Sequence, residues 1–184
     1  NGSETFTVSI TDSQLTDSQD ITVTVLAVND APVATVSLSG TTAEDQSVVI
    51  SLSGSDVDDD VLTFTAENPS NGSIIVDGSI ATYTPDANYN GVDSFSFTVS
   101  DGSLSDTAEV TVSVSAVNDA PVLAVVSDVD FDEDTSTSIS VSASDVDGDD
   151  LTFSITGGSE ITATLDGSNI AFTASANYNG SETF

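Results

Sequence analysis

The sequence repeats itself with a period of 89 residues, and this repeat constrains the fold more than any other feature of the chain. The string VNDAPV occupies residues 28–33 and returns at residues 117–122, and NYNG occupies residues 88–91 and returns at residues 177–180. A fixed period of this size is typical of an array in which one structural unit recurs in tandem. The fold of one unit therefore predicts the fold of most of the chain.

Alternating apolar and polar residues predict that the unit consists of short β-strands. In one complete unit we expect seven strands, at residues 33–38, 48–52, 61–65, 73–76, 80–84, 94–99 and 108–114. Asn-Gly and Asp-Gly pairs, which favour tight turns, separate several of them. Such a unit predicts an all-β fold of tandem seven-stranded Greek-key β-sandwiches of the immunoglobulin type, joined end to end by short linkers. The side chains expected to face the core are Val48, Ile50, Leu52, Phe95, Phe97, Val99, Val110, Val112 and Val114.

Two prolines, Pro32 and Pro121, mark the expected domain boundaries, because proline cannot continue a central strand. Residues 30–118 then form one complete sandwich. Residues 1–29 supply the last two strands of a preceding repeat, and residues 119–184 supply the first five strands of a following repeat. Neither partial repeat is expected to close a sandwich alone.

The two ends of the chain carry the same string, NGSETF, at residues 1–6 and 179–184, two periods apart. The chain thus begins and ends at the same point of the repeat. Two explanations stay open at this stage. The sequence is a window of a longer array, or strands donated by one chain complete the unfinished repeat of an identical chain and build a filament.

The charge of the chain restricts its partners. It carries 31 acidic residues and no Lys, Arg or His, which gives a formal charge of −31. Nucleic acids and anionic membrane surfaces are bound through Lys and Arg, so both are excluded as partners. We find no apolar span long enough to insert into a membrane in this segment. The remaining partners are cationic, and metal ions are the simplest of them.

The residue types also argue against catalysis. The chain has no His, Cys or Lys, so the usual general bases and activated nucleophiles are missing. Only a pair of carboxylates, as in glycosidases, could do acid–base chemistry. We therefore expect that the chain is not an enzyme.

Acidic turns provide candidate calcium ligands. Residues 55–64 read SDVDDDVLTF and residues 144–153 read SDVDGDDLTF, so carboxylates stand at alternate positions in both repeats. Ca²⁺ prefers several oxygen ligands in a flexible cage, which suits clustered Asp, Glu and Asn side chains on loops. The alternative interpretation is a solvated acidic turn.

The direction of the strands predicts where these loops lie. If successive strands reverse direction, the acidic turn at residues 56–60 and the turns at 77–78 and 101–102 share one end of the sandwich with the linker at residues 29–30. At this first junction the candidate ligands are Asn29, Asp30, Asp56, Asp58, Asp60 and Asp101.

The loops at residues 44–45, 67–68 and 86–93 are expected at the opposite end, by the linker at residues 118–119. At this second junction the candidate ligands are Glu44, Asp45, Asp86, Asn88, Asn90, Asp93, Asn118, Asp119, Asp145, Asp147 and Asp149, and Glu133 and Asp134 are the repeat equivalents of Glu44 and Asp45.

The segment DANYNGVD, at residues 86–93, matches the opening of an EF-hand loop, with oxygens at the first, third and fifth positions followed by glycine. Phe97 stands where an EF-hand has its bidentate glutamate, and Ser175 replaces Asp86 in the second copy. Metal contact and a purely structural turn, anchored by Tyr89 and Tyr178, both stay open for this loop.

An N-D-x-P linker, a D-x-D turn and an early acidic pair are together similar to cadherin repeats. The chain more closely resembles the bacterial cadherin-like tandem repeats of giant RTX-type surface adhesins, in which VNDAPV, ED and NYNGxDSF recur. The resemblance covers the whole chain and implies that Ca²⁺ at the linkers stiffens the array. Ala27, Ala31, Ala116 and Ala120 replace linker residues of cadherins, which leaves the number of ions per junction open.

These observations predict an extracellular structural repeat at the bacterial cell surface, part of a calcium-rigidified stalk, adhesin or filament. Its expected partners are calcium ions and neighbouring repeats of the same chain or of identical chains. An adhesive module that recognises a carbohydrate or protein ligand is the alternative.

Overall fold

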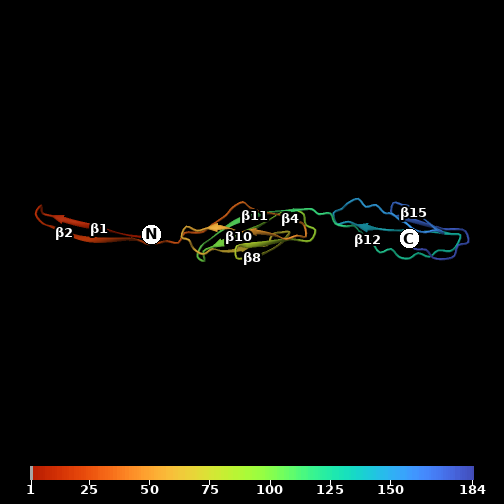
Figure 1. Ribbon diagram of the computed structural model, residues 1–184, viewed down its shortest axis with the longest axis horizontal. Coiled ribbons are helices and arrows are strands. Elements are labelled where there is room, and N and C mark those ends of the chain that lie inside the picture. Colours follow the sequence, from red (N-terminus) through yellow and green to blue (C-terminus); the bar gives the residue numbers. More distant parts are fainter. Residues whose placement is uncertain (1) are drawn as a thin grey trace. The chain divides into compact units, whose positions relative to one another are not determined.

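The computed structural model describes residues 2–184, and this range contains strands, turns and loops but no helix (Figure 1). Consequently, none of the described residues belongs to a helix that could cross a membrane. The chain divides into two compact units, Asn1–Ala116 and Val117–Phe184. The first unit contains an N-terminal hairpin and a central domain.

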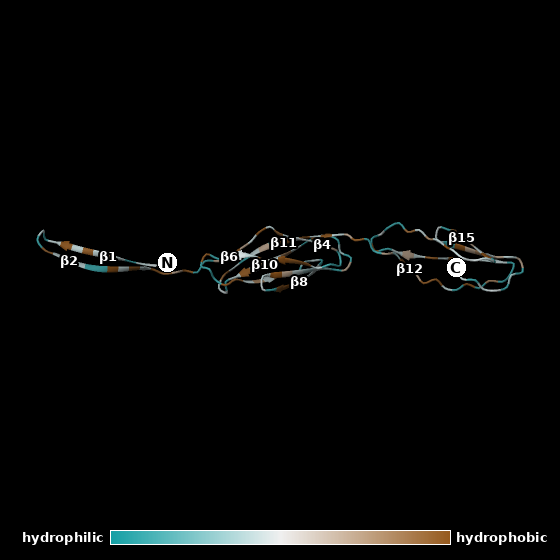
Figure 2. Ribbon diagram, in the orientation of Figure 1, coloured by the Kyte–Doolittle hydropathy of each residue, from teal (hydrophilic) through white to brown (hydrophobic). Residues whose placement is uncertain are grey.

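The N-terminal hairpin consists of β1 (Gly2–Thr11) and β2 (Thr16–Val25), which pair antiparallel along their whole length. Its turn is closed by Asp12, whose carboxylate accepts hydrogen bonds from the backbone N–H groups of Gln14 and Leu15 at 2.9 and 2.7 Å. Every residue of both strands is exposed. Figure 2 shows hydrophobic bands along both strands of this hairpin.

The central domain is built from two sheets and a short additional strand pair. Its strands are β3 (Val33–Ala34), β4 (Leu38–Ala43), β5 (Val48–Ser51), β6 (Gly54–Ser55), β7 (Thr63–Ala66), β8 (Gly72–Asp77), β9 (Ile80–Pro85), β10 (Gly91–Ser100) and β11 (Ser105–Ser115). One sheet has the order β4-β11-β10-β7, the other has the order β5-β9-β8, and β3 pairs with β6. The predicted all-β sandwich fold is confirmed.

The central domain has nine strands where seven were predicted: β6 was not predicted, and β10 and β11 each begin three residues earlier than predicted. The largest differences concern the strands predicted at residues 33–38 and 61–65. The strand predicted at residues 33–38 is divided into β3 and β4, which belong to different sheets. The division lies at Ser37, whose φ of 64° is incompatible with a continuous strand. The strand predicted at residues 61–65 begins only at Thr63, where β7 meets its partner β10.

The core of the central domain lies between its two sheets. Of the nine side chains predicted to face it, eight are buried, and Val48 is half-buried. Ala34, Ala81 and Tyr83 complete the core, and Tyr83 is fully buried. The period-2 pattern therefore identified the inner faces of β5, β10 and β11 correctly, because successive side chains of a strand alternate between its two faces.

The C-terminal unit contains β12 (Val122–Leu123), β13 (Ser136–Ser140), β14 (Ala143–Ser144), β15 (Ile161–Asp166) and β16 (Asn169–Ala174). β13, β16 and β15 form a sheet in that order, and β12 pairs with β14. These pairings repeat those of β5, β9 and β8 and of β3 and β6, 89 residues later. The buried side chains of this unit are Val141, Ile170 and Phe172.

Candidate metal sites

The acidic turn of the central domain follows β6. The Oδ1 atom of Asp56 accepts a hydrogen bond from the backbone N–H of Asp58 at 2.8 Å, and Asp59 adopts a positive φ of 62°. This tight turn brings one carboxylate oxygen each of Asp56, Asp58 and Asp60 within 4.8 Å of one another. The Oδ2 atom of Asp56 is buried and has no hydrogen-bond partner. Three carboxylates therefore converge, and one of them presents an unsatisfied buried oxygen.

The linker before the domain is attached to this turn. The backbone N–H of Asp30 donates to Oδ2 of Asp58 at 2.8 Å, and the side-chain amide of Asn29 donates to Oδ2 of Asp101 at 2.8 Å. The hydrogen bond from Asn29, with those from the backbone N–H groups of Leu104 and Ser103, lowers the pKa of Asp101. The structure thus brings the turns at residues 56–60 and 101–102 to the linker at residues 29–30, as loop alternation predicts.

The C-terminal unit repeats this arrangement. The backbone N–H of Asp119 donates to Oδ2 of Asp147 at 2.7 Å, and the backbone N–H of Asp147 donates to Oδ1 of Asp145 at 2.9 Å. Carboxylate oxygens of Asp145, Asp147 and Asp149 lie within 4.8 Å of one another. Gly148, with φ of 77°, takes the place of Asp59. The same backbone conformation therefore serves both turns, although different residues supply the positive φ.

The acidic pairs Glu44-Asp45 and Glu133-Asp134 lie beside the NYNG loops. Oδ1 of Asp45 accepts a hydrogen bond from the backbone N–H of Asn88 at 3.1 Å, and Oδ1 of Asp134 accepts one from the backbone N–H of Asn177 at 3.3 Å. Glu44 is buried, and its backbone N–H donates to the carbonyl oxygen of Ser115 near the C-terminal end of the domain. The remaining candidates in this region, Asp86, Asn88, Asn90, Glu133 and Asp134, are exposed.

Asp93 points into the domain. Its Oδ2 atom accepts hydrogen bonds from the hydroxyl group of Tyr83 and from the backbone N–H of Asn71, both at 3.1 Å. Its Oδ1 atom accepts one from the backbone N–H of Ser94 at 3.0 Å. Burial of Tyr83, together with the nearby charge of Asp93, raises the pKa of the Tyr83 hydroxyl. The protein itself therefore supplies partners for both oxygens of Asp93.

The loop that contains Asp93 is also held by Tyr89, whose hydroxyl group donates to the carbonyl oxygen of Val92 at 2.8 Å. This hydrogen bond ties Tyr89 to its own loop, which agrees with the anchoring role that the sequence suggests for Tyr89.

Glu182, two repeats after Glu4 and one after Asp93, was not among the predicted site residues. Its carboxylate accepts hydrogen bonds from the hydroxyl group of Ser159 at 2.6 Å and from the backbone N–H groups of Glu160 and Ile161 at 3.0 and 2.8 Å. The sequence could have indicated Glu182 as a candidate, because this position of the repeat is acidic in all three copies, as Glu4, Asp93 and Glu182.

We expect the carboxyl group of Glu182 to titrate far below the ordinary glutamate value of 4.5. The hydrogen bond from Ser159, followed by those from Glu160 and Ile161, lowers its pKa from 4.5 to about 2. A depressed folded-state pKa contributes stability above the unfolded value, and that contribution is lost as the pH falls from about 4.5 toward 2. A carbon-detected NMR titration should place the Glu182 midpoint near 2, and Ser159→Ala should raise it. A Glu182 midpoint near 4.5 would contradict this prediction.

Two segments of the chain, residues 29–113 and 118–184, match the family model of the bacterial Ig domain. No curated protein matches the sequence.

Among solved structures, an endo-fucoidan hydrolase from glycoside hydrolase family 107 is 22% identical, with a TM-score of 0.40; the match covers 95% of this chain and 30% of the hydrolase. Drosophila N-cadherin EC1-3 is 14% identical, with a TM-score of 0.39 and coverage of 55% and 41%. The titin M3 domain is 18% identical, with a TM-score of 0.31 and coverage of 46% and 96%.

The chain spans less than a third of the length of the hydrolase. The family match covers most of the sequence and places its boundaries at the two linkers. The chain therefore belongs to the bacterial Ig domain family, of which it contains two matched copies in tandem.

Proposed function

We propose that the chain is an extracellular structural segment whose acidic turns bind Ca²⁺ at the domain junctions and stiffen a stalk, adhesin or filament at the bacterial cell surface. The observation that carries this proposal is the convergence of three carboxylates in each of two repeats, next to a linker that is hydrogen-bonded to the same turn. Membership of the bacterial Ig domain family supports a non-enzymatic structural or adhesive role.

The chemistry of the turn fits calcium. All the available side-chain ligands are carboxylate or amide oxygens, which Ca²⁺ prefers, whereas Zn²⁺ sites commonly use nitrogen or sulfur. The buried Oδ2 atom of Asp56 has no hydrogen-bond partner, and an isolated unsatisfied oxygen of this kind calls for an explanation such as a bound ion. Asp56, Asp58 and Asp60 would hold the ion in the central domain, and Asp145, Asp147 and Asp149 would hold it in the C-terminal unit.

Electrostatics favour a cation at these turns. Two unit charges about 4 Å apart repel each other by about 1 kcal/mol in water and by about 4 kcal/mol at an effective dielectric constant of 20. The chain contains no Lys, Arg or His that could neutralise this repulsion. A divalent cation bound in a turn reduces the repulsion between its carboxylates. The affinity of the turn for the cation therefore derives largely from negative charge that no basic side chain of the protein neutralises.

The linker explains how such an ion would stiffen the array. Asp30 and Asp119 are the residues at which the chain enters each repeat, and each donates its backbone N–H to the middle aspartate of the acidic turn. An ion held by that turn immobilises the acceptor of this hydrogen bond and thereby restricts the linker.

Calcium should lengthen and stabilise the chain. Extracellular calcium modules bind with a Kd on the order of 10⁻⁴ to 10⁻³ M, so millimolar Ca²⁺ should be sufficient. We expect small-angle scattering of the monomeric fraction to show a larger maximum dimension in Ca²⁺ than in chelator, and thermal melting to show a higher Tm. An identical scattering profile and Tm in the two buffers would exclude the proposed stiffening.

A pair of matched variants assigns the effect to the acidic turn. Asp145→Asn combined with Asp147→Asn removes two charges from the second turn and should lower the calcium bound at saturation in isothermal titration calorimetry. Asp17→Asn combined with Glu109→Gln removes two exposed charges elsewhere and should leave calcium binding nearly unchanged. Equal losses in both variants would indicate a diffuse attraction by net charge rather than a site.

A further inference from the structure

Asn-Gly pairs occur at four places in the sequence, at residues 1–2, 71–72, 90–91 and 179–180. Three of these pairs recur at one position of the repeat, whereas the pair at residues 71–72 is replaced by Glu160-Ile161 in the next copy. Asn-Gly favours tight turns because glycine carries no side chain. For the same reason, nothing on the glycine shields its backbone nitrogen from the side-chain amide of the asparagine. The two pairs of the central domain present the same chemistry in two different surroundings.

The reaction open to such a pair is deamidation. The backbone nitrogen of the glycine attacks Cγ of the asparagine, a bond forms between these two atoms, and the bond from Cγ to the amide nitrogen breaks. The amide nitrogen takes up the proton of the backbone nitrogen and leaves as ammonia. Water then opens the resulting succinimide ring and yields aspartate or isoaspartate. Because the asparagine must turn its side chain over the following nitrogen, hydrogen bonds and tight packing that hold either residue oppose the reaction.

The pair Asn71-Gly72 is held in place by its neighbours. The backbone N–H of half-buried Asn71 donates to Oδ2 of Asp93 at 3.1 Å, and its carbonyl oxygen accepts from the backbone N–H of Asp86 at 2.9 Å. Gly72 is the first residue of β8, and a Cβ atom at this position would lie only 2.5 Å from the carbonyl oxygen of Thr84. Both residues of this pair are therefore fixed, and deamidation would have to break their contacts.

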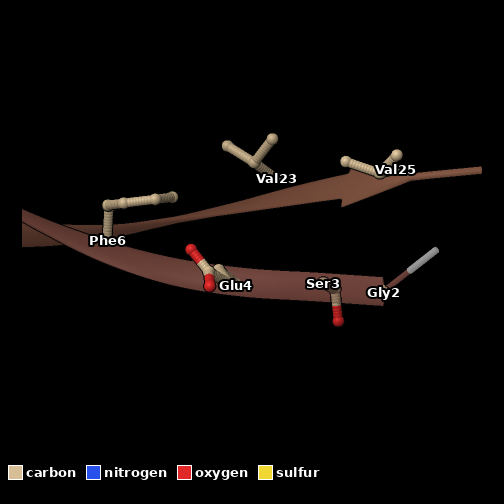
Figure 3. Close-up of a pocket in the computed structure, with 6 residues that line it drawn as sticks. All are labelled: Gly2, Ser3, Glu4, Phe6, Val23 and Val25. Carbon is tan, nitrogen blue, oxygen red and sulfur yellow. The ribbon is translucent and has the colours of Figure 1, made fainter.

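The pair Asn90-Gly91 has much more open surroundings. Both residues are exposed, and among the described residues the side-chain amide of Asn90 makes no hydrogen bond. The three atoms nearest to a Cβ atom built on Gly91 all belong to the side chain of Tyr89, at 3.2–4.0 Å. Gly2, the repeat equivalent of Gly91, likewise lies at the start of its strand, β1 (Figure 3). The amide of Asn90 is therefore free to turn toward the nitrogen of Gly91.

We propose that Asn90 is a site of spontaneous deamidation in the folded central domain, whereas Asn71 is protected by the fold. The reaction needs water and no enzyme. Its product adds a carboxylate to a loop that already carries Asp86 and Asp93. The isoaspartate form also inserts a methylene group into the main chain directly before Gly91↔Val114, the first pair of β10 and β11. The modification thus changes both the charge of the loop and the entry into β10.

Peptide mapping by mass spectrometry measures the two sites in one sample. The full chain is incubated at neutral pH, in native buffer and in concentrated urea, and is then digested with pepsin, because a chain without Lys or Arg offers trypsin no cleavage site. In native buffer the deamidated product should accumulate several times faster at Asn90 than at Asn71. In urea both pairs lose their surroundings, so the two rates should become similar.

Two variants assign the product to its residue. Asn90→Gln retains an amide, but its longer side chain would have to close a larger ring, so the product at this position should disappear. Asn71→Gln is the matched control and should leave the rate at Asn90 unchanged. Circular dichroism of each variant before incubation verifies that its strands are folded.

The proposal is overturned if the folded chain deamidates at Asn71 as fast as at Asn90. It is overturned equally if Asn90 stays intact in native buffer over a period in which the chain in urea reacts completely. A difference between the two sites that persists unchanged in urea would attribute the selectivity to the neighbouring residues in the sequence, and would also exclude protection by the fold.

Discussion

Replacing Phe97 by alanine is expected to lower the free energy of unfolding of the central domain by about 3–5 kcal/mol, the usual cost of removing a buried phenylalanine ring. Phe97 is fully buried in the middle of β10, and its ring lies 6.5 Å from that of Phe64 on β7. The substitution leaves a cavity between the two sheets. Since domains of this kind are stable by about 5–15 kcal/mol, much of the stability would be lost. Urea unfolding followed by circular dichroism measures the change.

The same strand offers a matched control for this experiment. Val92 also lies on β10, but it is 68% exposed. Val92→Ala should change the free energy of unfolding by less than about 0.5 kcal/mol. A cost for Phe97→Ala no larger than that for Val92→Ala would show that the two sheets do not pack as described.

The second large loss of stability is expected when Asp93 is replaced by alanine. Asp93→Ala removes the carboxylate oxygen that accepts from the buried Tyr83 hydroxyl and from the backbone N–H of half-buried Asn71, and it leaves the hydroxyl with the carbonyl oxygen of Asn71 at 3.4 Å as its acceptor. Each buried donor without a partner costs about 1–3 kcal/mol. We therefore expect a loss of about 3 kcal/mol in the free energy of unfolding, measured by the same urea titration. Glu109→Ala, which removes an exposed carboxylate from β11, should cost less than about 0.5 kcal/mol.

A double-mutant cycle tests whether the loss arises from the hydrogen bond to Tyr83. Tyr83→Phe removes the hydroxyl group that Asp93 accepts from, so the cost of Asp93→Ala should be smaller in that background by about 1 kcal/mol. Strict additivity of the two substitutions would mean that the two side chains do not interact.

Much of the fold could be predicted from alternation and turn residues. The inner faces of β10 and β11 were identified because Phe95, Phe97 and Val99 recur at every second position, and side chains of a strand alternate between its faces. The division of the first strand at Ser37 could not be predicted in this way. A single positive φ at a serine depends on how the two sheets meet at that point, and no residue type signals it.

The candidate site was predictable in part. Spacing in the sequence identified Asp56, Asp58 and Asp60, because alternate residues of a tight turn can direct their side chains to one point. The hydrogen bond from Asp30 to Asp58 joins residues far apart in the chain, and only the folded domain shows it. Likewise, the sequence predicts Asp93 only as one of several candidate metal ligands. The structure shows that it is buried and accepts a hydrogen bond from Tyr83.

The sequence by itself determined the period of 89 residues, the strand-rich architecture and the acidic turns, since each of these follows from local residue patterns. Only the tertiary structure decided which acidic residues are buried. Asp93 is 6% exposed and accepts hydrogen bonds from Tyr83 and Asn71, whereas Asp86, seven residues earlier, is exposed. Both are aspartates of the same segment, but a carboxylate is buried only where donors satisfy its oxygens, and one of these donors, Asn71, lies 22 residues away in the chain.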